Sequence, residues 1–368
     1  MTKTRVIILF GGRSAEHEIS ILSARNVLAA LDRQRYEPVL IGIDRAGGWH
    51  LESERTLAAA TGSPRALALD PAAPPVGVET ALIQSAPSGG EAIDTVVFPV
   101  LHGTFGEDGT VQGLLDLADA AYVGAGVLGS AVGMDKEVAK RLLRDAGIPI
   151  VDFVLVTASA FARDAEAALA PAARFGFPVF VKPSNAGSSV GVSKVRDRLG
   201  LASAVRAALA YDRKVLIERA VDAREIECSV LGNDDPIASV PAEILVHHKD
   251  GFYSYDAKYV DADGASFRVP AEIPAPVTTR VQELAVQTFR ALELAGMARV
   301  DFFLERTGSG AEPALYVNEV NTIPGFTAMS MYPKMWEASG LPQKELLNRL
   351  IDLALERRNL RRALKTGA

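Results

Sequence analysis

The stretch VFVKPSNAGSSVGVSKV, Val179 to Val195, looks like a phosphate-binding loop, yet it fits no standard nucleotide-binding pattern. The P-loop pattern G-x-x-x-x-G-K-[ST] has its lysine after the glycines, whereas here Lys182 comes before Gly187 and Gly191. The dinucleotide pattern G-x-G-x-x-G is also absent from this stretch. We therefore expect Lys182 to be a fixed cation at the end of a strand, followed by a flexible glycine–serine cover. A hairpin loop with an exposed lysine is the alternative.

The composition is that of a soluble protein with more than one domain. With 368 residues, 48% of them hydrophobic and 23% charged, two or three domains are expected. The net charge of −6 argues against a general affinity for nucleic acid or anionic membranes. The single cysteine, Cys228, fits a reducing compartment, and the apolar run Val6–Phe10 is too short for a signal peptide. We expect a cytoplasmic protein with no nucleic-acid or membrane partner.

The first third of the chain alternates strand and helix patterns. The runs RVIILF, YEPVLIGI and IDTVVFPVLHG have the composition of buried strands, and EISILSARNVLAAL has the apolar spacing of a helix. This rhythm predicts a mostly parallel sheet with helices on its faces. The segment rich in alanine and proline near residues 57–77 is typical of a surface insertion.

The middle third begins with a well-marked helix. Asp135 is a good N-cap, and Val138, Leu142 and Ala146 fall on one helical face. A strand DFVLVT, a single helix over about Phe161–Phe175 and a strand PVFVK are expected to follow.

The last third, from Arg219 onward, combines antiparallel strands with helices. EIECSVLG, IASVPAEI, ARVDFFLE and ALYVNEVN have strand patterns, and TTRVQELAVQTFRALELAG has the spacing of an amphipathic helix. A terminal helix is expected from about Pro342, with a basic and polar tail from Arg357 onward.

Two of these strands carry acidic and amide side chains among apolar ones. Because side chains along a strand alternate between its two faces, each strand is expected to present one set to a common face: Arg299, Asp301 and Phe303 on the first, and Leu315, Val317, Glu319 and Asn321 on the second. On neighbouring strands, Asp301, Glu319 and Asn321 would converge as oxygen ligands suited to Mg²⁺ or Mn²⁺. A salt bridge between Arg299 and the acids is the alternative.

Three further residues lie where ligands often bind. Glu16 follows a Gly-Gly turn at the start of a helix, where it could bind an ammonium group or complement the helix dipole. His102 follows a strand of the predicted parallel sheet and could bind substrate or cap its loop. Gly325 could let backbone N–H groups approach a ligand or form an ordinary turn.

Taken together, eight segments resemble the D-alanine–D-alanine ligases of the ATP-grasp superfamily. They are GGRSAEHEIS, FPVLHGTFGEDGTVQG, GMDKEVAKRLL, FVKPSNAGSSVGVSKV, VLIERAVDAREIECSVLG, FYSYDAKY, ARVDFFL and NEVNTIPGFTAMSMYP. Any one of them is weakly specific, but their order and spacing are highly specific. The resemblance covers most of the chain, apart from the segment rich in alanine and proline and the last residues.

The resemblance implies an α/β fold, α+β in part, with a three-domain ATP-grasp architecture. The expected domains are an N-terminal Rossmann-like parallel-sheet domain that binds substrate, a central ATP-grasp domain and a C-terminal catalytic ATP-grasp domain, at residues 1–124, 125–218 and 219–368. It also implies that ATP lies between the second and third domains and that the protein is a homodimer.

Particular residues are implied for ATP and for metal ions. Those implied for ATP are Lys136 and Lys182 at the phosphates, Glu218, Arg219 and Ala220 at adenine, Glu225 at the ribose, and Ser188 and Ser189 in the covering loop. Those implied to hold two Mg²⁺ or Mn²⁺ ions on the phosphates are Asp301, Glu319 and Asn321.

A second set of residues is implied for the amino-acid substrates. It consists of Glu16 at the first ammonium group, Lys258 and Ser330 at the second carboxylate, Arg299 and the Gly325 amide at the oxyanion, and His102 in the substrate site. The resemblance also implies that Glu16, Ser188 and Tyr259 form a hydrogen-bonded set that closes two loops over the site.

The implied reaction is the ATP-dependent ligation of two D-alanines through a D-alanyl phosphate, for the synthesis of peptidoglycan precursors. Phosphoryl transfer needs positioning and neutralisation of charge rather than a nucleophilic side chain, which agrees with the lysines, the arginine and the oxygen ligands. A D-alanine–D-lactate or D-serine ligase is the alternative within the family, although Tyr259 favours the dipeptide. A non-catalytic ATP-binding or regulatory protein that kept the fold is the alternative of a different functional class, and the presence of both lysines and all three metal-ligand candidates argues against it.

Overall fold

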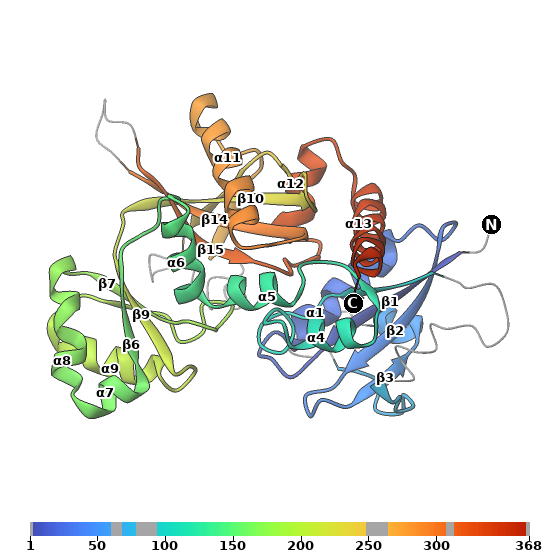
Figure 1. Ribbon diagram of the computed structural model, residues 1–368, viewed down its shortest axis with the longest axis horizontal. Helices are drawn as coiled ribbons and strands as arrows, with labels where there is room; N and C mark the ends of the chain where they lie inside the picture. The colour runs from blue at the N-terminus through green and yellow to red at the C-terminus, as the bar shows by residue number, and fades with distance from the viewer. Residues whose placement is uncertain (1–2, 60–67, 79–93, 248–263, 307–312, 366–368) are drawn as a thin grey trace.

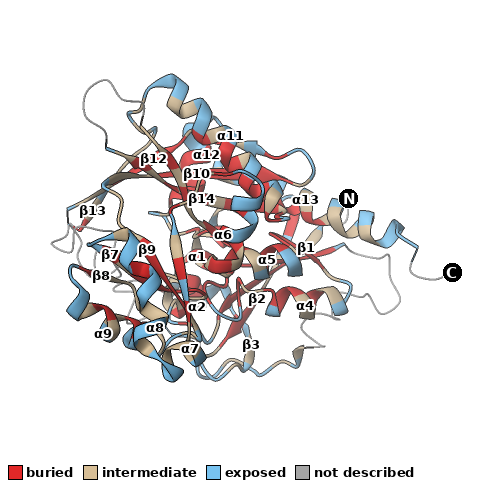
Figure 2. Ribbon diagram, turned by 60° about the vertical axis from the view of Figure 1, so that its left-hand side comes forward, coloured by how far each residue is buried: buried red, intermediate tan, exposed pale blue. Residues whose placement is uncertain are grey.

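The part of the chain that the structure describes forms three β-sheets with helices packed around them (Figure 1). The computed structural model describes residues 3–59, 68–78, 94–247, 264–306 and 313–365. Buried residues concentrate in the strands of each sheet and on the inner faces of the helices, as Figure 2 shows. Within these described ranges, no helix is both long enough and apolar enough to cross a membrane.

The N-terminal sheet has five strands in the order β3-β2-β1-β4-β5. The strands are β1 (Thr4–Gly11), β2 (Tyr36–Ile43), β3 (Trp49–Glu52), β4 (Thr95–Pro99) and β5 (Ala121–Tyr122). All pairs are parallel except β2 with β3, which confirms the predicted mostly parallel sheet. Its helices are α1 (His17–Ala30), α2 (Glu54–Ala59) and α4 (Thr110–Leu117). The described part of the segment rich in alanine and proline lies beside β3, where Val76 N donates to Trp49 O at 2.9 Å.

The central sheet is antiparallel, with strands in the order β6-β9-β7-β8. The strands are β6 (Phe153–Thr157), β7 (Val179–Pro183), β8 (Ser193–Val195) and β9 (Lys214–Arg219). The helices on and before this sheet are α5 (Val127–Met134), α6 (Lys136–Asp145), α7 (Ala158–Arg163), α8 (Ala165–Leu169), η2 (Ala170–Phe175) and α9 (Arg198–Ala208).

The single helix predicted over about Phe161–Phe175 is wrong, because the segment forms three short helices. Asp164 has an extended backbone that ends α7, and its side chain then caps α8 by accepting from Ala167 N at 3.0 Å. Pro171 follows, at the start of η2. Since proline has no N–H to donate, it cannot continue the hydrogen-bonding pattern of α8.

The helix α6 begins at the predicted N-cap, since Asp135 accepts from Glu137 N and Val138 N. The apolar positions Val138, Leu142 and Ala146 do not form the buried face of this helix: Leu142 is 38% exposed, and the buried positions include Lys140 and Leu143. The reason is that this helix buries charged side chains, whereas the spacing of apolar residues predicts that charged side chains face the solvent.

The C-terminal sheet has its main path in the order β13-β12-β10-β14-β15, and β11 pairs with β10. The strands are β10 (Ala223–Gly232), β11 (Ile237–Ala238), β12 (Ala242–Val246), β13 (Ala265–Arg268), β14 (Gly296–Glu305) and β15 (Leu315–Asn321). Every pair is antiparallel, as the sequence predicts. The helices are α11 (Ala275–Ala291), α12 (Met331–Ala338) and α13 (Gln343–Ala363).

A β-bulge changes which residues of β15 share a face. Asp301 pairs with Glu319, but the next residue of β14, Phe302, pairs with Val317, so Asn318 is the extra residue. Val317 therefore packs in the core with Phe302, whereas Glu319 lies on the opposite, partly open face. The prediction that Leu315 and Val317 share a face with Glu319 and Asn321 is wrong for this reason.

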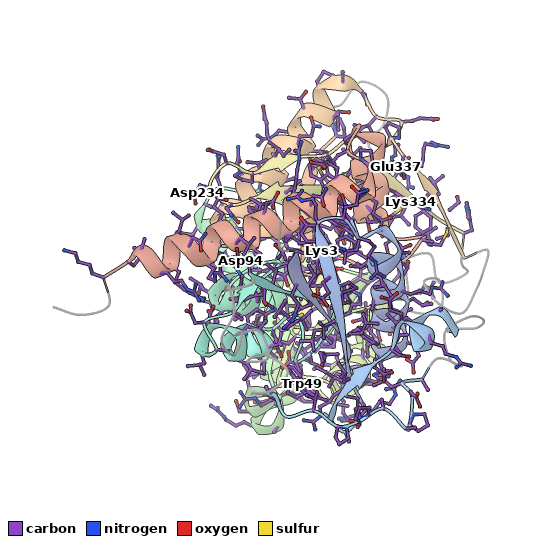
Figure 3. All side chains as sticks on the ribbon, turned by 90° about the vertical axis from the view of Figure 1, so that its right-hand side faces the viewer. Lys3, Trp49, Asp94, Asp234, Lys334 and Glu337 are labelled. Atoms are coloured by element: carbon purple, nitrogen blue, oxygen red, sulfur yellow. The ribbon has the colours of Figure 1, made fainter. Side chains whose placement is uncertain are left out.

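The helix α13 ties the C-terminal sheet to the N-terminal sheet, across which it lies in Figures 1 and 3. It continues to Ala363, so the predicted basic tail after Arg357 is mostly helical. Arg357 lies 4.3 Å from the centre of the Tyr122 ring and donates to the backbone oxygens of Tyr122 and Gly124. Arg358 donates to Asp94, labelled beside this helix in Figure 3, at 2.9 Å.

Candidate active site

Two adjoining cavities lie where the three sheets meet. The smaller, of about 420 Å³, is lined by residues of the central and C-terminal sheets. The larger, of about 760 Å³, adds residues from the start of α1 and the loop after β4. Both cavities are lined by Lys136, Ala186, Glu227 and Glu319, so these residues form the junction between them.

Lys182 lies in the smaller cavity, near the end of β7. Its ammonium group is 2.7 Å from Glu218 Oε2 and donates to Asn318 Oδ1 at 3.1 Å. The ammonium also lies 5.6 Å from the centre of the Phe303 ring. At 9% exposure, Lys182 is not the exposed hairpin lysine that the sequence left as the alternative.

Glu218, on β9, is buried between two lysines. Lys182 approaches one of its carboxylate oxygens, and the Lys140 ammonium lies 3.2 Å from the other. Burial acts to raise the pKa of Glu218, but the two ammonium groups outweigh it and leave the pKa below its ordinary value. Sequence reasoning missed Lys140, although its position one helical turn after Lys136 puts both lysines on one side of α6.

The remaining residues expected around ATP also line the smaller cavity. They are Ser189, Arg219, Ala220 and Glu225. The Arg219 guanidinium lies 5.8 Å from the centre of the Tyr316 ring. Phe180, Phe302 and Phe303 also line this cavity. The cavity therefore offers the aromatic walls and cationic groups that a nucleotide requires.

Arg299 and Asp301 form an ion pair at the edge of this cavity, so the salt bridge that the sequence left as the alternative is present. Two nitrogens of Arg299 donate to the two Asp301 oxygens, each at 2.7 Å, and Glu227 lies 3.3 Å from Arg299. Burial acts to lower the pKa of Arg299, but Asp301 and Glu227 outweigh it and raise the pKa well above its ordinary value. The guanidinium is thus a permanently charged group beside the larger cavity.

The three candidate metal ligands converge on neighbouring strands. Asp301 pairs with Glu319 across β14 and β15, and Asn321 donates to Asp301 at 3.0 Å. Among the described residues, no three His, Cys, Asp or Glu side chains form a metal site by themselves. Mg²⁺ usually takes one or two carboxylates and completes its shell with water and substrate phosphates. Two carboxylates and one carboxamide therefore fit a metal that is bound together with a nucleotide.

Lys136 lies at the junction of the two cavities. Its ammonium group is 3.3 Å from Glu319 and donates to Ala186 O at 2.8 Å. It therefore connects a candidate metal ligand with the loop after β7. A cation at this position faces both cavities and is well placed to hold a group that passes between them.

Glu16 and Ser188 meet in the larger cavity, where the Ser188 hydroxyl donates to the Glu16 carboxylate. Ser188 and Ser189 both have left-handed backbones, with φ of 50° and 58°. A Cβ atom at Gly187 would lie 2.8 Å from Glu16 Oε2, and one at Gly103 would lie 2.9 Å from the same atom. Both positions need glycine so that the two loops can approach Glu16 closely.

His102 and Glu107 are buried behind Glu16 and join the N-terminal loop to the C-terminal segment. Nδ1 of His102 lies 3.0 Å from Ile323 O, and the Glu107 carboxylate accepts from Ile323 N and Gly103 N. Burial lowers the pKa of His102, which favours the neutral ring at pH 7. Burial raises the pKa of Glu107 to about 8, and Glu16 adds to this shift. Sequence reasoning missed Glu107, although it lies inside the segment FPVLHGTFGEDGTVQG, which carries part of the family resemblance.

Gly325 and Ser330 also line the larger cavity. A Cβ atom at Gly325 would lie 2.7 Å from Ser330 Oγ, so the absence of a side chain lets the two residues lie together. The Ser330 hydroxyl also accepts from Thr327 N at 2.9 Å. Lys258 and Tyr259, the two other residues expected here, lie outside the described residues.

One glycine-rich segment has a structural role instead. The letters GAGVLG, 124–129, match the dinucleotide pattern between β5 and α5, yet the segment lines neither cavity. A Cβ atom at Gly129 would lie 2.4 Å from Glu293 O. The match therefore reflects close packing of α5 against the C-terminal part of the chain.

Comparisons with known proteins agree with this geometry. Residues 5–125 match the family model described as D-ala D-ala ligase N-terminus, and residues 142–352 match D-ala D-ala ligase C-terminus. The chain is 47% identical to D-alanine–D-alanine ligase A of Salmonella typhimurium over 373 residues, which cover 100% of both chains.

Two solved structures are similar along nearly the whole chain. The D-alanine–D-alanine ligase of Coxiella burnetii is 37% identical with a TM-score of 0.82, and the match covers 98% of this chain and 97% of that one. A D-Ala:D-Ser ligase of Enterococcus faecalis is 35% identical with a TM-score of 0.79, over 96% and 99% of the two chains.

Proposed function

The chain belongs to the D-alanine–D-alanine ligase family, and we propose that it joins two D-alanines in an ATP-dependent reaction. The observation that carries this proposal is the pair of adjoining cavities that share Lys136 and Glu319. A nucleotide in the smaller cavity would have its terminal phosphate at this junction, next to a carboxylate substrate in the larger one. This is the arrangement that transfer of a phosphoryl group between two bound molecules requires.

The residues of the smaller cavity suit the parts of ATP. Lys136 and Lys182 supply positive charge for the phosphates, and the loop with Ser188 and Ser189 covers them. The strand-end segment Glu218–Ala220 would hold adenine, while Glu225 would accept hydrogen bonds from the ribose hydroxyls. These assignments follow the family resemblance, and the positions of the side chains support them.

The metal ligands and Arg299 would compensate the negative charges of the phosphates and of the oxyanion. Asp301, Glu319 and Asn321 would hold two Mg²⁺ or Mn²⁺ ions, which neutralise the charge of the phosphates when bound. Arg299 would stabilise the oxyanion of the tetrahedral intermediate, together with the Gly325 amide. Both residues line the larger cavity, where the two amino acids would meet.

The larger cavity would hold the two D-alanines. Glu16 would bind the ammonium group of the first, and Ser330, with Lys258, would bind the carboxylate of the second. The first carboxylate takes the γ-phosphoryl group to give D-alanyl phosphate and ADP. The amine of the second D-alanine then attacks the acyl carbon, so that the C–O bond breaks, phosphate leaves and the amine loses its proton.

The contact between Glu16 and Ser188 supports a covering role for the loop after β7. D-Alanyl phosphate reacts with water, so the site has to be closed before the phosphoryl transfer. Ser188 donates to Glu16, and both residues line the larger cavity. Tyr259 would complete this set in the family arrangement. His102, in its neutral form, would hold the loop after β4 against the C-terminal segment on the substrate side.

Three broader features belong to the same proposal. The chain would divide into domains at 1–124, 125–218 and 219–368, with one sheet in each. It would act in the cytoplasm, where ATP is available, in the synthesis of peptidoglycan precursors. It would also form a homodimer, which light scattering on the purified protein would test. Dissociation to monomers at the working concentration would contradict this last point.

An ADP-release assay across D- and L-amino acids tests the proposed function. Release that depends on D-alanine and Mg²⁺, with D-alanyl-D-alanine as product, is expected. The similarity to a D-Ala:D-Ser ligase supports one second candidate, an enzyme that accepts another second substrate. Mass spectrometry of the products from equal D-alanine, D-serine and D-lactate separates the two. No ADP release with D-alanine, either alone or mixed with D-serine and D-lactate, would contradict both candidates.

A further inference from the structure

Lys140 is a buried lysine that has no role in the proposed reaction, and the sequence does not predict its burial. It lies on α6 with 1% of its surface exposed, and it lines neither of the two cavities. Its ammonium group lies 3.2 Å from Glu218 Oε1, and this is its only ion-pair partner in the part of the chain that the structure describes. A buried ammonium group is costly unless a carboxylate compensates it.

Glu218 is therefore shared between a lysine inside the cavity and a lysine behind it. Lys182, in the cavity, lies 2.7 Å from Oε2, and Lys140, on the far side, lies 3.2 Å from Oε1. The three groups together carry two positive charges and one negative charge. Without Lys140, Glu218 and Lys182 would form a neutral pair with no net charge to offer a phosphate.

We propose that Lys140 is a positioning residue that neutralises Glu218 from behind, so that the charge of Lys182 is available to the nucleotide phosphates. The proposal rests on the proposed function, in which Lys182 binds ATP. When Lys182 turns toward a phosphate, Glu218 keeps a partner in Lys140. If Lys140 were absent, the same movement would leave a buried carboxylate without compensation, which is costly.

The charges of Lys140 and Glu218 depend on each other. Burial lowers the pKa of Lys140, and the Glu218 carboxylate opposes this shift. Replacing Glu218 by glutamine would therefore favour the neutral form of Lys140. Lys140 should then matter little for the nucleotide, because there is no carboxylate left to neutralise.

The experiment is a double-mutant cycle on nucleotide affinity, without turnover. The Kd of a β,γ-imido analogue of ATP with Mg²⁺ is measured by calorimetry for the unmodified chain, K140M, E218Q and K140M/E218Q. We expect K140M to weaken binding about tenfold, since a unit charge several ångströms away has been removed. In the E218Q background the same substitution should change the Kd by less than about twofold.

Two further variants make the result decisive. R144M removes a charge from an exposed position on the same helix, so its Kd should match that of the unmodified chain. K182A should weaken binding of the analogue. If it does not, Lys182 does not bind the phosphates, and both the proposed role of Lys182 and the inference about Lys140 are wrong. If K182A weakens binding but K140M does not, only the inference about Lys140 is wrong.

An equal loss on K140M in both backgrounds would also overturn the inference, because it would show that Lys140 acts without Glu218. Near-ultraviolet circular dichroism and thermal unfolding establish that each variant is folded. If K140M does not fold, K140Q takes its place in the cycle, because its uncharged amide can still donate to the Glu218 carboxylate. K140Q is then expected to weaken binding about tenfold and K140Q/E218Q to bind as E218Q does, and equal affinities of K140Q and the unmodified chain would contradict the proposal.

Discussion

Ser188 and Glu16 are 172 residues apart in the chain, yet the Ser188 hydroxyl donates a hydrogen bond to the Glu16 carboxylate. Glu16 stands at the start of α1, and Ser188 lies in the loop after β7. Both residues line the larger cavity, and their contact joins the N-terminal and central parts of the chain. The hydrogen bond therefore fixes the covering loop to the group proposed to bind the first D-alanine.

Ser188→Ala is expected to lower kcat/KM roughly 10–100-fold while leaving the protein folded, because misplacing a substrate-positioning group has an effect of this size. ADP release at several D-alanine concentrations measures the change, and thermal unfolding tests the fold. Ser203→Ala is a suitable control, since Ser203 is exposed and donates to Gly200 O in its own helix. Unchanged kinetics in Ser188→Ala would show that the hydrogen bond has no part in closure.

Gly187→Ala is expected to disturb the same contact through sterics. The added Cβ atom would lie 2.8 Å from Glu16 Oε2, closer than such atoms pack, so the loop or Glu16 has to move. We expect a higher KM for D-alanine and at least about a tenfold loss of kcat/KM. In Gly113→Ala the new atom meets nothing within 4 Å, so this control should keep full activity. Equal activities in the two variants would argue against close contact at Gly187.

The strand alternation in the sequence predicts most of the geometry around Asp301, but not all of it. Arg299 and Asp301 share a face as expected, since β14 is regular up to that point. The bulge at Asn318 reverses the faces within β15, so Val317 turns to the core while Glu319 turns to the cavity. A pattern of period two cannot show a bulge, because the extra residue looks like any other.

Buried charges are the second feature that the sequence conceals. Lys140 and Glu107 look like ordinary surface residues, since charged side chains are rarely buried. Their burial depends on partners far away in the chain, Glu218 for the lysine and Ile323 N for the glutamate. The packing of separate parts of the chain brings these groups to their distant partners, so the spacing of Lys140 after Lys136 places it on the same side of α6 but does not show that it is buried.

Arg357→Ala is expected to destabilise the protein by about 2–4 kcal/mol, because the packing on Tyr122 is lost and two backbone oxygens lose their donor. Urea unfolding followed by circular dichroism measures the change. Arg349→Ala, on the same helix, is the control. Arg349 is 49% exposed, and its ion pair with Glu345 is long, at 3.9 Å, so its loss should lower the free energy of unfolding by less than about 0.5 kcal/mol. Similar losses in both variants would mean that Arg357 does not clamp α13 to the N-terminal sheet.

The pKa of Glu107 predicts how stability depends on pH. Burial raises this pKa from an ordinary 4.5 to about 8, so the folded state holds a proton that the unfolded state releases in that range. Stability falls with rising pH wherever the folded state binds more protons. The contribution of Glu107 should therefore be most favourable below about pH 4.5, decline between about pH 4.5 and 8, and level off above about pH 8.

Glu107→Gln should remove this decline, because glutamine does not titrate. The substitution has a constant cost, since one amide N–H of the glutamine would face a backbone N–H of Gly103 or Ile323. The free energy of unfolding, measured with urea at several pH values, should thus fall less steeply between pH 5 and 8 in the variant. Glu166→Gln, at an exposed glutamate, should leave the slope unchanged. If the free energy of unfolding changed with pH in the same way for Glu107→Gln and the unmodified chain, the pKa of Glu107 would lie near its ordinary value, and the burial argument would be contradicted.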